Sequence, residues 1–275
     1  MTTEFRKTKN LISHNCKAKY LPNGKTLLTI FNKDIFIDDG WECARPPRGE
    51  NERTYVLDNP RSDNVRRAKN SVFEIAAANE WEYMVTLTLD GSKIDRYDRK
   101  EIIRPFTKWL QNSTARKGLM YVIVPELHED GAVHFHGLTN GGLDLADSGT
   151  VKAKGKKKPI KRETARRYGL DPAELITVYN VDNFPLGYST AIPLDGNREA
   201  VARYMTKYIT KDFSKIFGKS YFAGGKELKR KLPFSLHDVK YADWGGREYD
   251  VPEVGKVKYI QIDTEEFNKY LGAAI

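Results

Sequence analysis

Residues 121–138 read YVIVPELHEDGAVHFHGL, and this stretch decides the fold. Its two ends, 121–126 and 132–138, are rich in β-branched, aromatic and apolar residues, a composition typical of strands. Between them, Glu129-Asp130-Gly131 fits a three-residue hairpin loop with glycine in the left-handed position. Strands joined by so tight a turn must be antiparallel, so the sequence predicts an antiparallel sheet.

This hairpin brings residues of the types that bind metal ions to one face of the sheet. His134 and His136 are two residues apart on a strand, so their imidazoles project to the same side. The turn pairs Glu126 with His134 and Val124 with His136, which adds a carboxylate to that side. Two histidines and a carboxylate suit Mn²⁺ or Mg²⁺ that also holds a substrate oxygen. His128, one pair nearer the turn, is a reserve ligand. Two histidines with this spacing also occur on strands that bind no metal.

The segments on either side of the hairpin predict further strands and amphipathic helices. They are a helix from Asp63 or Asn64 to about Asn79, a strand at 83–89, a helix at 99–113, strands at 175–181 and 187–192, and a helix from about 197 to 213. Together with the hairpin they predict an α+β fold, in which helices flank a mainly antiparallel sheet.

The last of these helices carries a pair of tyrosines. Tyr204 and Tyr208 are four residues apart and share a helix face, and Lys207 and Lys211 follow each of them by three residues. Ionising a phenol at pH 7 costs roughly 4 kcal/mol. A nearby cation and a polarised phosphate lower that cost, so the pattern is typical of tyrosine nucleophiles. The same spacing also fits half-buried packing, with the lysines on a solvated face.

Composition indicates an acidic partner. The chain has 275 residues, a net charge of +9 and a pI of about 9.3, which favours nucleic acid but also fits a generic basic surface. A basic loop at 152–167 predicts phosphate contacts through Lys156, Lys157, Lys158, Lys161 and Arg162. Two cysteines, no apolar run long enough for a bilayer and no signal-peptide core at the N-terminus predict a cytoplasmic protein without a membrane partner.

Three motifs occur in a familiar order. They are Met84–Leu89, His134-Phe135-His136, and Tyr204–Lys211 with its two tyrosines and trailing lysines. In this order they resemble the replication initiators of the HUH endonuclease superfamily, of the two-tyrosine rolling-circle type found in single-stranded DNA phages and plasmids. The resemblance runs from about residue 65 to 215.

The resemblance implies a five-stranded antiparallel sheet of the RRM-like type and a divalent metal held by His134, His136 and a third polar residue, which maps to Glu126. It implies nicking of single-stranded DNA at a replication origin in a bacterial host cell, a 5′-phosphotyrosine link and a free 3′-OH that primes a host polymerase. Gly218-Lys219-Ser220 lacks the earlier glycine of a GxxxxGK[ST] motif, so unwinding is assigned to a host helicase.

The sequence divides into an N-terminal extension over 1–60 with a β-hairpin at 18–31, an endonuclease core over 61–240 and a tail over 241–275. Two alternatives remain open at this level. One is a non-catalytic module that binds single-stranded nucleic acid by stacking and phosphate contacts. The other is a transposase or mobilisation enzyme with the same chemistry. Which tyrosine attacks first, and whether both do, is also open.

Overall fold

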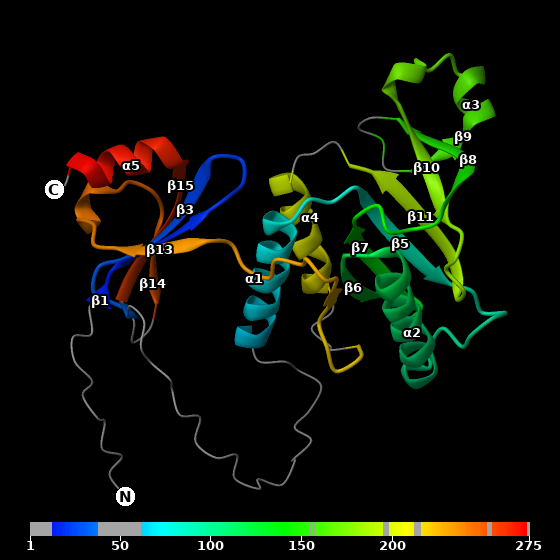
Figure 1. Cartoon of the computed structure of the whole chain (residues 1–275), viewed down its shortest axis with the longest axis horizontal. Helices are drawn as coiled ribbons and strands as arrows, with labels where there is room; N and C mark the ends of the chain where they lie inside the picture. The colour runs from blue at the N-terminus through cyan, green and yellow to red at the C-terminus, as the bar shows by residue number, and fades with distance from the viewer. Residues whose placement is uncertain are drawn as a thin grey trace, which may run out of the picture. The chain divides into compact units, whose positions relative to one another are not determined.

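The computed structural model describes residues 13–37, 62–153, 156, 158–194, 198–211, 216–251 and 255–273. The chain divides into two compact units, coloured by residue number in Figure 1. The central unit is Leu57–Lys231, and the terminal unit joins Met1–Val56 with Leu232–Ile275. In the described part of the chain, no helix is both long enough and apolar enough to cross a membrane.

The central unit is built on an eight-stranded sheet in which every pair of neighbouring strands is antiparallel. The strand order is β12-β6-β7-β5-β11-β10-β8-β9. The strands are β5 Tyr83–Leu89, β6 Tyr121–Leu127, β7 Val133–Thr139, β8 Leu145–Ala153, β9 Ile160–Lys161, β10 Leu175–Val181, β11 Gly187–Pro193 and β12 Phe222–Gly224. The predicted α+β fold with an antiparallel sheet is confirmed. The sheet is larger than the five strands expected, because β8 and β9 extend one edge and β12 extends the other.

Helices lie on both faces of this sheet (Figure 1). They are α1 Ser62–Ala78, α2 Arg99–Lys117, α3 Arg162–Arg167 and α4 Arg198–Lys211, with a 3-10 turn at Pro172–Glu174. The ring of Phe106 in α2 stacks on Phe135 of β7 with centroids 4.0 Å apart, which fixes the apolar core on that face. On the other face α1 packs beside α4, and both contact β6.

Helix α2 is longer than predicted. It begins after Asp98, whose carboxylate accepts the backbone N–H groups of Lys100 and Glu101, and it continues four residues beyond the expected end at Ser113. Gly118 ends the helix because it adopts φ 65°, a left-handed conformation that favours glycine.

The basic segment at 152–167 is not the loop that the sequence predicted. Its first two residues belong to β8, residues 160–161 form β9, and Arg162–Arg167 form α3. Weak periodicity hid these elements, because a two-residue strand and a six-residue helix are too short to show a repeat.

The 121–139 hairpin has the predicted register. Glu126 lies opposite His134 and Val124 opposite His136. The backbone N–H of His128 donates to the carbonyl of Ala132 at 2.9 Å. Gly131 adopts φ 84°, the left-handed conformation that the three-residue loop requires.

Close packing of this hairpin requires a glycine immediately after His136. A Cβ atom on Gly137 would lie 2.6 Å from Cγ1 of Ile123 and 2.9 Å from the carbonyl oxygen of Val122. We expect Gly137→Ala to reduce the free energy of unfolding by about 1–3 kcal/mol, because the strands must separate to admit the methyl group. Chemical denaturation of the variant measures the change. Gly245→Ala is the matched control, since no atom lies within 4 Å of its added Cβ. Equal stability of the two variants would contradict the prediction.

The terminal unit contains a second antiparallel sheet, with the order β13-β2-β3-β15-β14. Its strands are β2 Cys16–Tyr20, β3 Lys25–Phe31, β13 Phe234–His237, β14 Glu248–Val251 and β15 Gly255–Asp263. A separate pair joins β1 Ser13–His14 to β4 Phe36–Ile37, and the unit also has a 3-10 turn at Tyr241–Asp243 and helix α5 Thr264–Ala273. The predicted hairpin at 18–31 is confirmed as β2 and β3. The two flanks of the sequence thus share one sheet.

Candidate functional site

Two histidines and a glutamate lie together on the face of the central sheet that α4 covers. Nε2 of His136 is 3.0 Å from Oε2 of Glu126, and the rings of His134 and His136 have centroids 4.9 Å apart. Glu126 is buried although it is a carboxylate, and such burial is rare unless the group is bonded. The predicted register therefore produces a compact, polar cluster.

Two threonines of β5 hold the histidine rings. Oγ1 of Thr86 is 3.2 Å from Nδ1 of His136, and Oγ1 of Thr88 is 2.8 Å from Nε2 of His134. Sequence reasoning assigned no role to these threonines. Their signal was their alternation in β5, which sends both side chains to the face that the histidines share.

Helix α4 brings both tyrosines to this cluster. The ring of Tyr208 stacks on His136, with centroids 4.0 Å apart and an interplanar angle of 15°. The hydroxyl of Tyr208 donates a hydrogen bond to the hydroxyl of Tyr204. Tyr204 is 42% exposed, whereas Tyr208 is half-buried. The predicted helix face therefore points at the histidines, and its outer tyrosine is open to solvent.

Burial sets the protonation of these groups. It lowers the pKa of His134 to about 4, and the neighbouring His136 and His128 lower it further, against an opposite effect from Glu126. His134 is therefore neutral at pH 7, the form in which imidazole binds metal ions. Burial also raises the pKa of Tyr208, as do its hydrogen bond to Tyr204 and the nearby charge of Glu126.

The cluster fits a divalent cation by the chemistry of its donors, which are two imidazoles and a carboxylate on adjacent strands. Within the described ranges, no three or more His, Cys, Asp or Glu side chains are already arranged as ligands. Glu126 and His136 instead contact each other, so a bound ion would replace that contact. His128, the reserve ligand, stacks on His134 with centroids 4.7 Å apart.

A family comparison covers this site. Residues 82–213 match the family model of the ORF2-type replication-associated proteins. The matched segment contains β5, the hairpin with Glu126 and the histidines, and both tyrosines. The match supports a replication-initiator family and a role in DNA replication. No curated protein and no solved structure was found to match the chain.

The predicted cations of the matched segment have different environments. Lys207 is exposed on α4, and the side chain of Lys211 lies outside the part that the structure describes. Lys156, Lys158 and Lys161 are exposed, and Lys157 lies outside the described residues. Arg162 instead forms an ion pair with Asp147 at 2.7 Å, which lowers the pKa of that carboxyl.

An exposed tyrosine extends the row of residues that carries His134. Tyr188 of β11 lies opposite Thr88 of β5, Thr88 lies opposite His134, and His134 lies opposite Glu126. Directly opposed residues project to the same face, so Tyr188 shares the face of the cluster. Its side chain is 67% exposed. Sequence reasoning missed this residue because it depends on the pairing of strands far apart in the chain.

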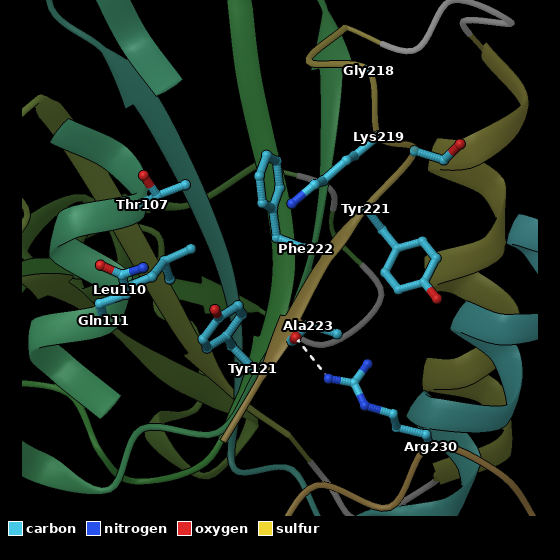
Figure 2. Close-up of a pocket in the computed structure, with 11 residues that line it drawn as sticks. Thr107, Leu110, Gln111, Tyr121, Gly218, Lys219, Tyr221, Phe222, Ala223 and Arg230 are labelled. Carbon is cyan, nitrogen blue, oxygen red and sulfur yellow. Dashed lines mark hydrogen bonds between the residues drawn. The ribbon is translucent and has the colours of Figure 1, made fainter. Parts of the chain in front are cut away.

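A pocket of about 510 Å³ lies between α2, β6 and the segment that leads into β12 (Figure 2). Tyr121 and Phe222 line it together with Lys219 and Arg230, and Arg230 donates a hydrogen bond to the carbonyl of Ala223 at 3.3 Å. Tyr121 and Phe222 belong to or pack against the core between the sheet and α2, whereas the histidines face α4. The pocket is therefore separate from the candidate site.

Proposed function

We propose that the protein is a metal-dependent DNA nicking and joining enzyme that initiates rolling-circle replication. The observation that carries this proposal is the stacking of Tyr208 on His136, which puts two phenols beside a His-His-Glu cluster. The replication-associated family match supports the biological role. A helix face used only for packing has no need of a histidine–glutamate cluster with an exposed tyrosine beside it.

In the proposed reaction a tyrosine oxygen attacks a phosphorus of single-stranded DNA. The bond from phosphorus to the 3′ oxygen breaks, the phenol loses its proton, and the 3′ oxygen gains one to become a free 3′-OH. The 5′ phosphate remains joined to the tyrosine. Because a phenolate leaves more readily than a sugar alkoxide, the phosphotyrosine keeps the strand able to rejoin.

The cluster would hold Mn²⁺ or Mg²⁺ through His134, His136 and Glu126. When bound, such an ion polarises the phosphate and stabilises negative charge that develops in the transition state. Thr86 and Thr88 orient the histidine rings for that role. Lys207, and Lys211 one turn later, supply positive charge along the tyrosine helix.

We propose that Tyr204 makes the first attack. It is the more exposed of the two phenols, so a DNA strand can reach its oxygen without a change in α4. Tyr208 lies beneath it against His136 and is placed for a second transfer. Two nucleophiles one helical turn apart permit cutting and rejoining without release of the first product.

The surroundings of the reaction are part of the same proposal. The substrate is single-stranded DNA at a replication origin, and the exposed lysines at 156, 158 and 161 contact its phosphates. The free 3′-OH is extended by a polymerase of a bacterial host cell, and a host helicase unwinds the duplex. The enzyme acts in the cytoplasm of that host.

The test is adduct formation on a denaturing gel. The full chain is incubated with single-stranded DNA from its own origin region, with Mn²⁺ or with EDTA. A slow-migrating protein–DNA adduct with Mn²⁺ and none with EDTA is expected. Tight DNA binding without cleavage in any divalent metal would instead favour a non-catalytic single-stranded nucleic-acid-binding module.

Tyr188 is expected to stack on a base of the bound strand. We expect Tyr188→Ala to raise the Kd for single-stranded DNA about tenfold, since stacking on an aromatic ring contributes ~1–3 kcal/mol per base. Fluorescence anisotropy in EDTA measures this binding without cleavage. Tyr188→Phe keeps the ring and should bind as the unaltered chain does. Equal affinity of the alanine variant would remove Tyr188 from the DNA path.

A further inference from the structure

We propose that the terminal unit has a second single-stranded DNA-binding surface on the face of its sheet opposite α5. Alternate residues of a strand project to opposite sides. Cys16, Ala18, Leu28 and Ile30 project to one side and pack with Phe267 of α5. The residues between them, together with their cross-strand partners, form the other side, which we call the outer face.

Three aromatic side chains stand on the outer face. Phe234 of β13 is 50% exposed, Tyr259 of β15 is 56% exposed and Tyr249 of β14 is 41% exposed. The rings of Tyr249 and Tyr259 contact each other, with centroids 5.7 Å apart. Large aromatic groups left open in this way on a sheet provide flat surfaces for unpaired bases.

Cations are interleaved with these rings. Nζ of Lys17 lies 3.9 Å from the ring centroid of Phe234, and the guanidinium of Arg247 lies 5.2 Å from that of Tyr249. Lys19 is paired directly opposite Phe234. An aromatic ring with a lysine or arginine beside it offers a base one contact and its phosphate another.

The charge of the outer face is complementary to nucleic acid. Among its described strand residues, the charged side chains are Lys17, Lys19, Lys25 and Asp263, and Asp263 is 3.6 Å from Lys25. The acids of β14, Glu248 and Asp250, alternate with Tyr249 and so project to the other side. Positive charge is thus concentrated where the aromatic rings are exposed.

The spacing of the rings favours a single strand. Phe234 and Tyr259 lie on β13 and β15, which are separated by β2 and β3. At about 4.8 Å between neighbouring strands, the two rings are ~14 Å apart, which leaves room for more than one base. Bases in a duplex are paired and stacked on one another, so only a single strand can use the rings. The choice of DNA over RNA rests on the proposed function.

The experiment measures binding of the full chain carrying Tyr204→Phe and Tyr208→Phe, in EDTA, to fluorescein-labelled oligothymidylate of about 20 nucleotides. Tyr259→Ala and Phe234→Ala are each expected to raise the Kd about tenfold, and Tyr259→Phe to restore it. Lys17→Ala should lower the slope of log affinity against log salt by about one. Lys269→Ala is the charge-matched control, because Lys269 is exposed on α5 and should leave that slope unchanged.

Photocrosslinking locates the contact directly. An oligonucleotide that contains 5-iododeoxyuridine is expected to label peptides with Tyr259, Tyr249 or Phe234. Labelling confined to 57–231, or unchanged Kd in both alanine variants at an unaltered melting temperature, would overturn the proposal. So would a fall in molecular mass in those variants, because the face would then hold a second copy of the chain. Failure of wild-type adduct formation would count against the nicking proposal and not against this surface.

Discussion

Replacing both Tyr204 and Tyr208 with phenylalanine is expected to abolish the covalent protein–DNA adduct, a loss on the order of a thousandfold or more in cleavage rate. Phenylalanine keeps the ring that stacks on His136 and loses only the hydroxyl group. The variant therefore keeps the packing of α4 against the hairpin and loses both nucleophiles. Single-turnover cleavage of labelled single-stranded DNA with Mn²⁺ measures the loss.

The single variants assign the two roles. Tyr204→Phe should lose the first cut, whereas Tyr208→Phe should still form an adduct but fail to pass the strand to a second phenol. Thr206→Ala is the matched control on α4, since its hydroxyl bonds locally to the carbonyl of Arg203. An adduct that persists in the double variant would mean that another residue attacks. Cleavage without any adduct would mean that the reaction is hydrolysis.

The second large effect is expected at the histidine–glutamate cluster. His136→Ala and Glu126→Gln should each weaken Mn²⁺ binding by more than the roughly 10–100-fold that outer partners of a metal site cost, and cleavage should fall with it. Both changes remove a donor atom from the closest contact in the cluster. Titration of Mn²⁺ by electron paramagnetic resonance measures binding without reference to activity.

Two comparisons make this result specific. Thr88→Val removes the hydroxyl beside His134 and should cost Mn²⁺ affinity within the roughly 10–100-fold range. His14→Ala removes another histidine that contacts a carboxylate, Asp238 at 3.1 Å in the terminal unit, and should leave Mn²⁺ binding unchanged. If the unaltered chain binds no Mn²⁺, or if His136→Ala binds it equally well, the assignment of the cluster as a metal site is wrong.

Much of the site followed from local rules. The sequence placed Glu126 opposite His134 because a three-residue turn leaves one register for its strands, and the structure has that register. It placed Tyr204 and Tyr208 on one helix face for the same kind of reason. Each of these relations spans fewer than about ten residues, so chain geometry decides it before any packing occurs.

Other features depend on contacts between distant segments. The contact of the tyrosine face of α4 with His136 joins segments far apart in the chain, and helical periodicity does not say which surface a face will meet. Tyr188 belongs to the row of His134 only because β11 pairs with β5. Thr86 and Thr88 became ring-orienting groups through the pairing of β5 with β7.

The clearest division lies between the hairpins and the sheets that contain them. By itself the sequence determined the two hairpins, the antiparallel character of the fold and the residues of the candidate site, because alternation and turn chemistry are local. Only the tertiary structure decided that the central sheet extends to eight strands and that β2 and β3 share a sheet with β13, β14 and β15. A strand edge can pair with many others, and the burial of side chains from the whole unit selects one pairing.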